Sequence, residues 1–241
     1  QFAVKNQDIY VLEANPRASR TVPFISKAIG IPIAKIASRI MAGEKLKKFN
    51  LEKRISNIFA IKEAVFPFNK FPNVDVLLGP EMKSTGEVMG IDKNFGLSFA
   101  KSQMACGNEL PVSGTAFISV KDKDKKNALN FAKKLKELNF KLSATSGTAK
   151  YLNNNGINCK KINKVREGSP HIVESLNAKN IELVINTTEG IKSISDSYSL
   201  RRSTLVNKIP YCTSLAAANA CIEAIHSLKN KKITVKAIQE L

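Results

Sequence analysis

The chain has 241 residues, and 38 Lys and Arg against 20 Asp and Glu give a formal net charge of +18. This excess first indicates a polyanionic partner: nucleic acid, an anionic membrane or phosphorylated small molecules. No apolar run approaches the ~18–20 residues of a membrane span, and there is no signal-peptide pattern. The four cysteines form no CxxC pair, which argues against a zinc ribbon or a disulfide framework and predicts reduced thiols in the cytoplasm.

Two strand-like runs open the chain, at residues 2–5 and 9–13, and Asn6-Gln7-Asp8 separates them. Two short strands across such a turn predict a β-hairpin. The first residue is Gln1 rather than Met, and a natural N-terminus seldom lies inside a hairpin. We therefore expect a piece of a longer polypeptide.

A helical period follows over residues 21–43, broken into two helices by Gly30-Ile31-Pro32, with Gly43 as the C-cap. We predict a strand at 60–68, an irregular stretch at 69–90 and a helix at 94–106. The loop composition at 107–114 predicts a domain boundary, which separates residues 1–112 from residues 113–241.

Strands and helices alternate in the second part. The predicted strands are 114–120, 141–144, 159–162, 183–186 and 210–213. The predicted helices are 125–138, 148–155, 171–177, 198–207 and 215–229. Repeated βα units of this length predict an α/β fold with a Rossmann-like, mostly parallel sheet and helices on both faces.

One polar cluster follows the second strand of the hairpin. Alternation sends Glu13 and Asn15 to one face of that strand, and two oxygen ligands at this spacing suit Mg²⁺ bound together with substrate phosphates. Arg17 and Arg20 follow closely and are suited to phosphate oxygens. From spacing alone, ordinary surface polarity explains the same four residues at least as well.

Five stretches of the sequence make a family resemblance visible: 2–5, 13–24, 27–43, 65–72 and 78–90, the last reading Leu-Gly-Pro-Glu-Met-Lys-Ser-Thr-Gly-Glu-Val-Met-Gly. They resemble the large subunit of carbamoyl phosphate synthetase, at the end of its second ATP-grasp unit. The resemblance implies that residues 1–112 are a truncated α+β remnant of that unit. It also implies that Gln1, Glu13 and Asn15 bind Mg²⁺ or Mn²⁺ with ATP, that Arg17 and Arg20 have catalytic roles at the phosphates, and that K⁺ is a further candidate ion.

The family forms carbamoyl phosphate from bicarbonate, ammonia released from glutamine, and two ATP, for pyrimidine and arginine biosynthesis. The resemblance thus implies a glutaminase small subunit as partner. Phosphoryl transfer depends on groups held around the nucleotide. The nucleotide-binding lobe and its glycine-rich loop are absent from this sequence, so we expect residues 1–241 alone to be inactive.

A second polar cluster lies in the basic part of the sequence. Thr145-Ser146-Gly147-Thr148 joins a predicted strand to a helix, and Asn186-Thr187-Thr188 follows another strand. Carboxyl ends of parallel strands and helix N-termini both favour anions, and Lys125 and Lys164 fall at similar junctions. A simple helix N-cap is the alternative for the first motif; the combination favours a phosphate pocket.

Residues 113–241 also resemble the methylglyoxal-synthase-like allosteric domain of the same large subunit. The resemblance implies self-association through this domain and binding of UMP or IMP by Lys125, Thr145, Thr148, Lys164, Asn186, Thr187 and Thr188. Ser146 and Glu189 depart from the family pattern. Methylglyoxal synthase chemistry is the enzymatic alternative, but Ser169-Pro170-His171 stands where a catalytic Asp is required.

A third set, implied by the resemblance, is an ornithine pocket of Glu63, Tyr211 and Thr213. The alternative is that these residues have no common ligand: Tyr211 is buried, Thr213 lies on an edge strand and Glu63 lies on the surface.

The rival function for the whole protein is a basic nucleic-acid-binding module. Aromatic residues make up only 7%, Trp is absent, and no RNP-like or helix-turn-helix motif appears, so we expect neither nucleic acid nor membrane as partner.

Overall fold

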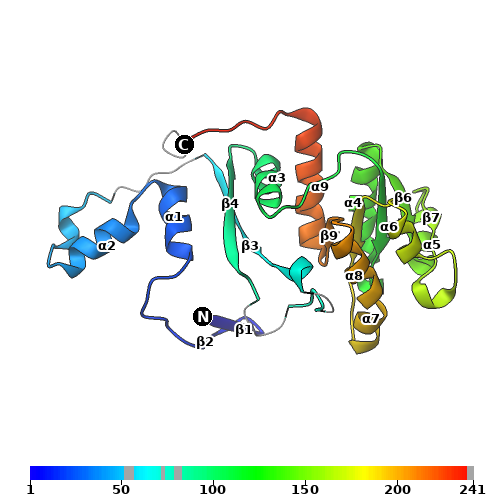
Figure 1. Cartoon of the computed structure of the whole chain (residues 1–241), viewed down its shortest axis with the longest axis horizontal. Helices are drawn as coiled ribbons and strands as arrows, with labels where there is room; N and C mark the ends of the chain where they lie inside the picture. The colour runs from blue at the N-terminus through cyan, green and yellow to red at the C-terminus, as the bar shows by residue number, and fades with distance from the viewer. Residues whose placement is uncertain (52–56, 72–73, 79–82, 238–241) are drawn as a thin grey trace. The chain divides into compact units, whose positions relative to one another are not determined.

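The computed structural model describes residues 1–51, 57–71, 74–78 and 83–237 (Figure 1). The protein divides into two compact units, Gln1–Ser56 with Lys236–Leu241, and Asn57–Val235. The boundary predicted between residues 112 and 113 falls inside the second unit and stays a prediction. None of the helices in the described ranges is long and apolar enough to cross a membrane.

The first unit begins with the predicted hairpin. β1 (Phe2–Lys5) pairs antiparallel with β2 (Asp8–Val11). Asn6 and Gln7 have φ angles of 51° and 73°, the left-handed conformation that two-residue hairpin turns require. The hairpin prediction is confirmed, although β2 ends at Val11, two residues earlier than predicted.

Two helices follow, as the Gly30-Ile31-Pro32 break predicts. α1 (Thr21–Ile29) ends at Gly30, whose φ of 67° only glycine adopts without strain. α2 (Ile33–Met41) precedes the short 3₁₀ helix η1 (Leu46–Lys48). The C-cap of α2 is Ala42, one residue before Gly43, which we predicted as the C-cap.

The second unit opens with a two-stranded antiparallel sheet of β3 (Phe59–Val65) and β4 (Gly86–Asp92), with the 3₁₀ turn η2 (Phe68–Lys70) between them. The prediction of irregular structure up to residue 90 is wrong from Gly86 onward. Gly86 and Gly90 interrupt the apolar alternation of β4, so the strand lacks the pattern that reveals a strand from sequence. Within the motif at residues 78–90, residues 79–82 lie outside the described residues.

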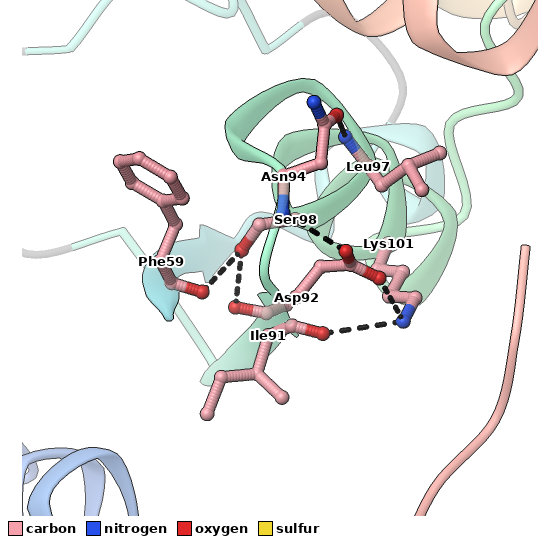
Figure 2. Close-up of polar contacts among 8 residues, drawn as sticks. Phe59, Ile91, Asp92, Asn94, Leu97, Ser98 and Lys101 are labelled. Carbon is pink, nitrogen blue, oxygen red and sulfur yellow. Dashed lines mark hydrogen bonds and ion pairs between the residues drawn. The ribbon is translucent and has the colours of Figure 1, made fainter. Parts of the chain in front are cut away.

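The helix α3 (Phe95–Ala105) packs against both of these strands. Figure 2 shows how the turn from β4 into α3 is held: Asn94 Oδ1 accepts a hydrogen bond from Leu97 N at 3.0 Å, and Asp92 Oδ1 accepts one from Asn94 N at 3.0 Å. Ser98 Oγ bridges the two strands, lying 2.8 Å from Phe59 O and 2.9 Å from Gly90 O. These bonds satisfy backbone groups that burial would otherwise leave without partners.

The five-stranded sheet is parallel throughout, with strand order β7-β6-β5-β8-β9. Its strands are β5 (Thr115–Ser119), β6 (Lys141–Ala144), β7 (Lys160–Lys161), β8 (Leu183–Asn186) and β9 (Tyr211–Cys212). The predicted parallel α/β sheet is confirmed. The first strand, β5, lies at the centre; β6 and β7 then follow on one side of it, and β8 and β9 on the other.

Helices cover both faces of this sheet. They are α4 (Lys125–Glu137), α5 (Ser146–Asn154), α6 (Ile172–Asn177), α7 (Ile191–Asp196), α8 (Tyr198–Val206) and α9 (Leu215–Asn230). Ala116 and Ile118 of β5 belong to one buried cluster together with residues of α4, α5 and α9. Phe117 points to the other face and packs in a second cluster with α6 and α8. Both faces are buried, which explains why β5 and β8 read as continuous apolar runs.

Candidate functional site

The sheet order creates a switch point between β5 and β8, because the connections leave these neighbouring strands in opposite directions. Ligands of open α/β sheets bind outside the carboxyl ends of the strands at such a point. A cavity of about 730 Å³ lies there, between the segments that follow β5 (Val120 to Lys123) and β8 (Thr187 and Glu189). We call it the strand-end cavity.

Four of the seven residues predicted to bind a nucleotide line the strand-end cavity: Thr145, Lys164, Asn186 and Thr187. The other three, Lys125, Thr148 and Thr188, are not among the described residues of its wall. Lys125 nevertheless reaches the start of α5, since a Cβ added to Gly147 would lie 3.3 Å from Lys125 Nζ. Gly147 thus leaves room for this ammonium group beside the N-terminus of the helix.

Hydroxyl groups gather at the cavity: Ser119 and Thr145 line its wall, and Thr148 lies behind them. Thr145 Oγ1 lies 3.5 Å from both Ser119 Oγ and Thr148 Oγ1. Thr145 is the N-cap residue of α5. Among the described residues, its side chain makes no capping hydrogen bond. Its hydroxyl therefore does not cap a backbone N–H of the helix, as the simple N-cap interpretation would require.

Thr148 and Thr187 hold the loop after β5 in place. Thr148 is buried, and its Oγ1 accepts a hydrogen bond from Val120 N at 3.4 Å. Thr187 Oγ1 accepts one from Lys121 N at 3.2 Å, and Thr187 N donates to Ser119 O at 3.0 Å. The loops after β5 and β8 are thereby fixed to each other at the cavity.

Lysines at the strand-end cavity pair with carboxylates: Lys123 of its wall, and Lys125 beside the start of α5. Lys125 Nζ lies 2.6 Å from Asp122 Oδ1, and Lys123 forms an ion pair with Glu189. The hydrogen bond from Lys125 lowers the pKa of Asp122. Such exposed pairs are individually weak, so an incoming phosphate can replace the carboxylate.

Lys121, Asp122 and Lys123 line the cavity although we did not predict them, because the run 121–126 reads as solvated surface. Their position directly after β5 could have identified them as binding residues, because in a parallel sheet every loop at a carboxyl strand end is a candidate binding loop.

A second cavity, of about 480 Å³, lies in the same unit, and its wall includes Glu63 and Tyr211 of the predicted ornithine set. Thr213 is exposed and is not among the described residues of that wall. The Glu63 carboxylate is held by Ser102 Oγ at 3.0 Å and by Gln103 Nε2 at 2.6 Å. Burial, together with the charge of Glu63, raises the pKa of the neighbouring Cys106 thiol to about 11, so this thiol stays protonated at neutral pH.

Arg201 of α8 also lines the second cavity and was not predicted. Its side chain is 2% exposed, and its Nε and Nη2 donate to Asp75 at 2.8 and 2.5 Å. This bidentate bond lowers the pKa of Asp75 and raises that of Arg201. No local pattern links residues 126 positions apart, so only the folded protein reveals the pair.

The predicted metal set lies in the first unit. Asn15 Nδ2 donates to Glu13 Oε1 at 3.0 Å, and the backbone nitrogen of Gln1 lies 2.7 Å from Glu13 O. One carboxylate and two side-chain amides offer the oxygen ligands that suit Mg²⁺ when phosphates and water complete its shell. Arg17 is exposed, and Arg20 stands at the N-cap of α1.

Comparison with known proteins gives two family matches. Residues 127–213 match the MGS-like domain, and residues 1–49 match the carbamoyl-phosphate synthase L chain ATP binding domain. The structure of methylglyoxal synthase from Elizabethkingia anophelis NUHP1 is similar at a TM-score of 0.40 and 20% identity, covering 47% of this protein and 79% of that one.

Curated relatives match along the whole sequence. The carbamoyl phosphate synthase large chain of Mesorhizobium japonicum is 54% identical over 100% of this sequence and 21% of its own length. The C-terminal section of the large chain from Methanopyrus kandleri is 50% identical over 98% of this sequence and 45% of its own length. The protein therefore spans about a fifth of the length of the first relative and less than half of the length of the second. It belongs to the carbamoyl phosphate synthase large-chain family, corresponds to the C-terminal part of that large chain, and carries an MGS-like domain.

Proposed function

We propose that this protein is the regulatory part of an ATP-dependent ligase that forms carbamoyl phosphate, and that it binds a nucleoside monophosphate, UMP or IMP, in the strand-end cavity. The observation that carries the proposal is the convergence of Thr145, Lys164, Asn186 and Thr187 on one cavity at the sheet's switch point. The four come from three separate segments of the sequence. Hydroxyls, an amide and an ammonium group are the donors that a phosphate and a ribose accept from.

The phosphate would lie at the start of α5, where free backbone N–H groups and the helix dipole favour an anion. Lys125 supports this placement because its Nζ stands beside Gly147. Thr148 would act indirectly, since its hydroxyl already contacts Thr145 and the backbone of Val120. We also propose that Thr188 contacts the nucleotide, as the family resemblance implies.

For the second cavity we propose ornithine as the ligand. Glu63 offers a carboxylate to an ammonium group, Tyr211 offers a hydroxyl, and Thr213 stands two residues after Tyr211. Gln103 and Ser102 already hold the Glu63 carboxylate, so the ammonium would join an organised group rather than order a mobile one.

At the other end of the sequence, Gln1, Glu13 and Asn15 would bind Mg²⁺ or Mn²⁺ with ATP, with Arg17 and Arg20 facing the phosphates and K⁺ as a further ion. The Glu13 and Asn15 side chains are exposed, and phosphoryl transfer needs enclosed, positioned groups. Residues 1–241 alone would therefore make no carbamoyl phosphate. The whole enzyme would use bicarbonate, two ATP and ammonia from a glutaminase subunit, in the cytoplasm, for pyrimidine and arginine synthesis, and would self-associate through the MGS-like domain.

Calorimetric titration of residues 1–241 with UMP and IMP tests the proposal. We expect saturable binding, lost in Lys164→Ala and kept in Lys150→Ala, since Lys150 is an exposed lysine of α5 away from the cavity wall. Ornithine binding should be lost in Glu63→Ala. The rival is a nucleic-acid module, and it predicts salt-sensitive DNA binding without nucleotide saturation. That outcome, or equal binding by both lysine variants, would reject the proposal.

A further inference from the structure

The two cavities share a wall. Neighbouring residues of α8 face different cavities: Leu200 lines the strand-end cavity and Arg201 lines the second. Two residues of α7, Ser193 and Asp196, also line the strand-end cavity. The segment from α7 to α8 therefore contributes to both cavities at once.

One hydrogen bond joins the two cavities directly. Asn186 lies in the strand-end cavity and is 3% exposed, and its Nδ2 donates to Tyr211 Oη at 2.9 Å. Tyr211 lines the second cavity. A displacement of either side chain thus changes the hydrogen bonding of the other without any intervening group.

Arg201 makes the second connection. Besides its two bonds to Asp75, its Nη1 donates to the carbonyl oxygen of Ile194 at 2.9 Å. Ile194 belongs to α7, between Ser193 and Asp196. The guanidinium group therefore holds a helix of the strand-end cavity while its own side chain forms part of the wall of the second cavity.

We infer that Arg201 is a positioning residue for α7, through which occupancy of the second cavity changes ligand affinity in the strand-end cavity. The bond between Asn186 and Tyr211 acts in parallel. This inference rests on the proposed function for its two ligands, and the Arg201 contacts are independent of that function.

The physical basis is competition for one guanidinium group. A ligand carboxylate in the second cavity can accept hydrogen bonds from Arg201 in the same way as Asp75. The five N–H donors of the guanidinium group have a fixed planar arrangement, so they cannot bind both carboxylates unless the group turns. Turning the fork alters the bond to Ile194 and with it the position of Ser193 and Asp196. Any effect on nucleotide affinity equals the difference in ligand affinity between the two arrangements, and it is reciprocal.

The first test needs no ligand. Hydrogen exchange of the α7 backbone amides is compared in the wild-type protein, Arg201→Gln and Arg202→Gln. Arg202 is the next residue of α8 and lines neither cavity among the described residues. We expect faster α7 exchange in Arg201→Gln alone, with a wild-type circular dichroism spectrum. Unchanged exchange would overturn the positioning role. If Arg201→Gln does not fold, Arg201→Lys, which keeps the charge without the fork, takes its place with the same expectation.

The second test measures coupling. The Kd of UMP is determined by calorimetry without ornithine and with saturating ornithine. We expect a ratio of about 5 or more in the wild-type protein, typical of coupled sites. The ratio should approach one in Arg201→Gln and fall in Tyr211→Phe, while Arg202→Gln keeps the wild-type value. A wild-type ratio of one, or an unchanged ratio in Arg201→Gln, would overturn the inference. If neither ligand binds, the proposed function fails, and the exchange experiment still decides whether Arg201 positions α7.

Discussion

Gly90 of β4 lies so close to α3 that a Cβ atom added to it would stand 2.0 Å from the carbonyl oxygen of Ser98. The close approach lets the Ser98 hydroxyl reach backbone oxygens of both β3 and β4 (Figure 2). A glycine is thus required at a position for which the sequence predicted only irregular structure. Gly96 of α3 has a corresponding role against α9, where a Cβ would lie 2.5 Å from Glu223 O.

We predict that Gly90→Ala destabilises the protein, because the atoms that a Cβ would meet belong to the backbone of α3 and cannot move aside cheaply. Overpacking of this kind costs about 1–3 kcal/mol. Gly86→Ala is the matched control in the same strand, since a Cβ there meets nothing within 4 Å. Urea unfolding of the two variants checks the prediction; equal stabilities would contradict the close packing of α3 on β4.

Asp122 is predicted to weaken anion binding in the strand-end cavity by holding Lys125. Asp122→Asn removes the competing charge while keeping the side-chain shape, so we expect the Kd for UMP to fall about two- to fivefold, as suits a modest exposed ion pair. Glu137→Gln is the control, because Glu137 is an exposed carboxylate at the other end of α4 and does not line the strand-end cavity. Calorimetric titration of both variants gives the comparison; weaker binding in Asp122→Asn would contradict this role.

The pair of Asp75 and Arg201 should make stability depend on pH. Arg201 lowers the pKa of Asp75 from its ordinary 3.8, so the stabilisation is fully present above about pH 4 and is lost as the pH falls through the lower, folded-state pKa. Asp75→Asn should cost about 2 kcal/mol at pH 7, because it leaves the buried guanidinium without its charge partner.

The check is the unfolding free energy of the wild-type protein and of Asp75→Asn at pH 7 and at pH 2. The difference between the two proteins should shrink at the acid end. An equal difference at both pH values would show that the Asp75 carboxylate contributes no pH-dependent stability. Asp122→Asn is the surface control, and we expect its unfolding free energy to match that of the wild type.

Much of the parallel sheet could be predicted from the sequence, because its signals are local. Strands β6 and β8 have the predicted bounds, since short apolar runs flanked by helical periods leave few alternatives. β4 could not be predicted, since Gly86 and Gly90 weaken the strand pattern and Gly90 serves a tertiary contact. α7 was also missed, because half of its residues are Ser or Asp, which favour turns and helix caps over helix interiors.

The candidate site was predictable where it depends on topology. The hydroxyl clusters after β6 and β8 meet because parallel strands bring their carboxyl ends to one edge. The family resemblance supplied the ornithine set, of which Glu63 and Tyr211 share one cavity. Arg201, Asp75 and the ion pair of Lys123 with Glu189 depend on tertiary geometry that sequence spacing does not encode.

The most direct test of nucleotide binding in the strand-end cavity is to locate the bound nucleotide on the protein. Backbone amide shifts of isotope-labelled protein are measured by NMR during titration with UMP. We predict saturable shifts at Ser119–Lys123, Thr145–Thr148 and Asn186–Glu189, around the strand-end cavity. The opposite result would be unchanged shifts at these amides and movement instead near a separate cavity between α4 and α9, around Lys134 and His226.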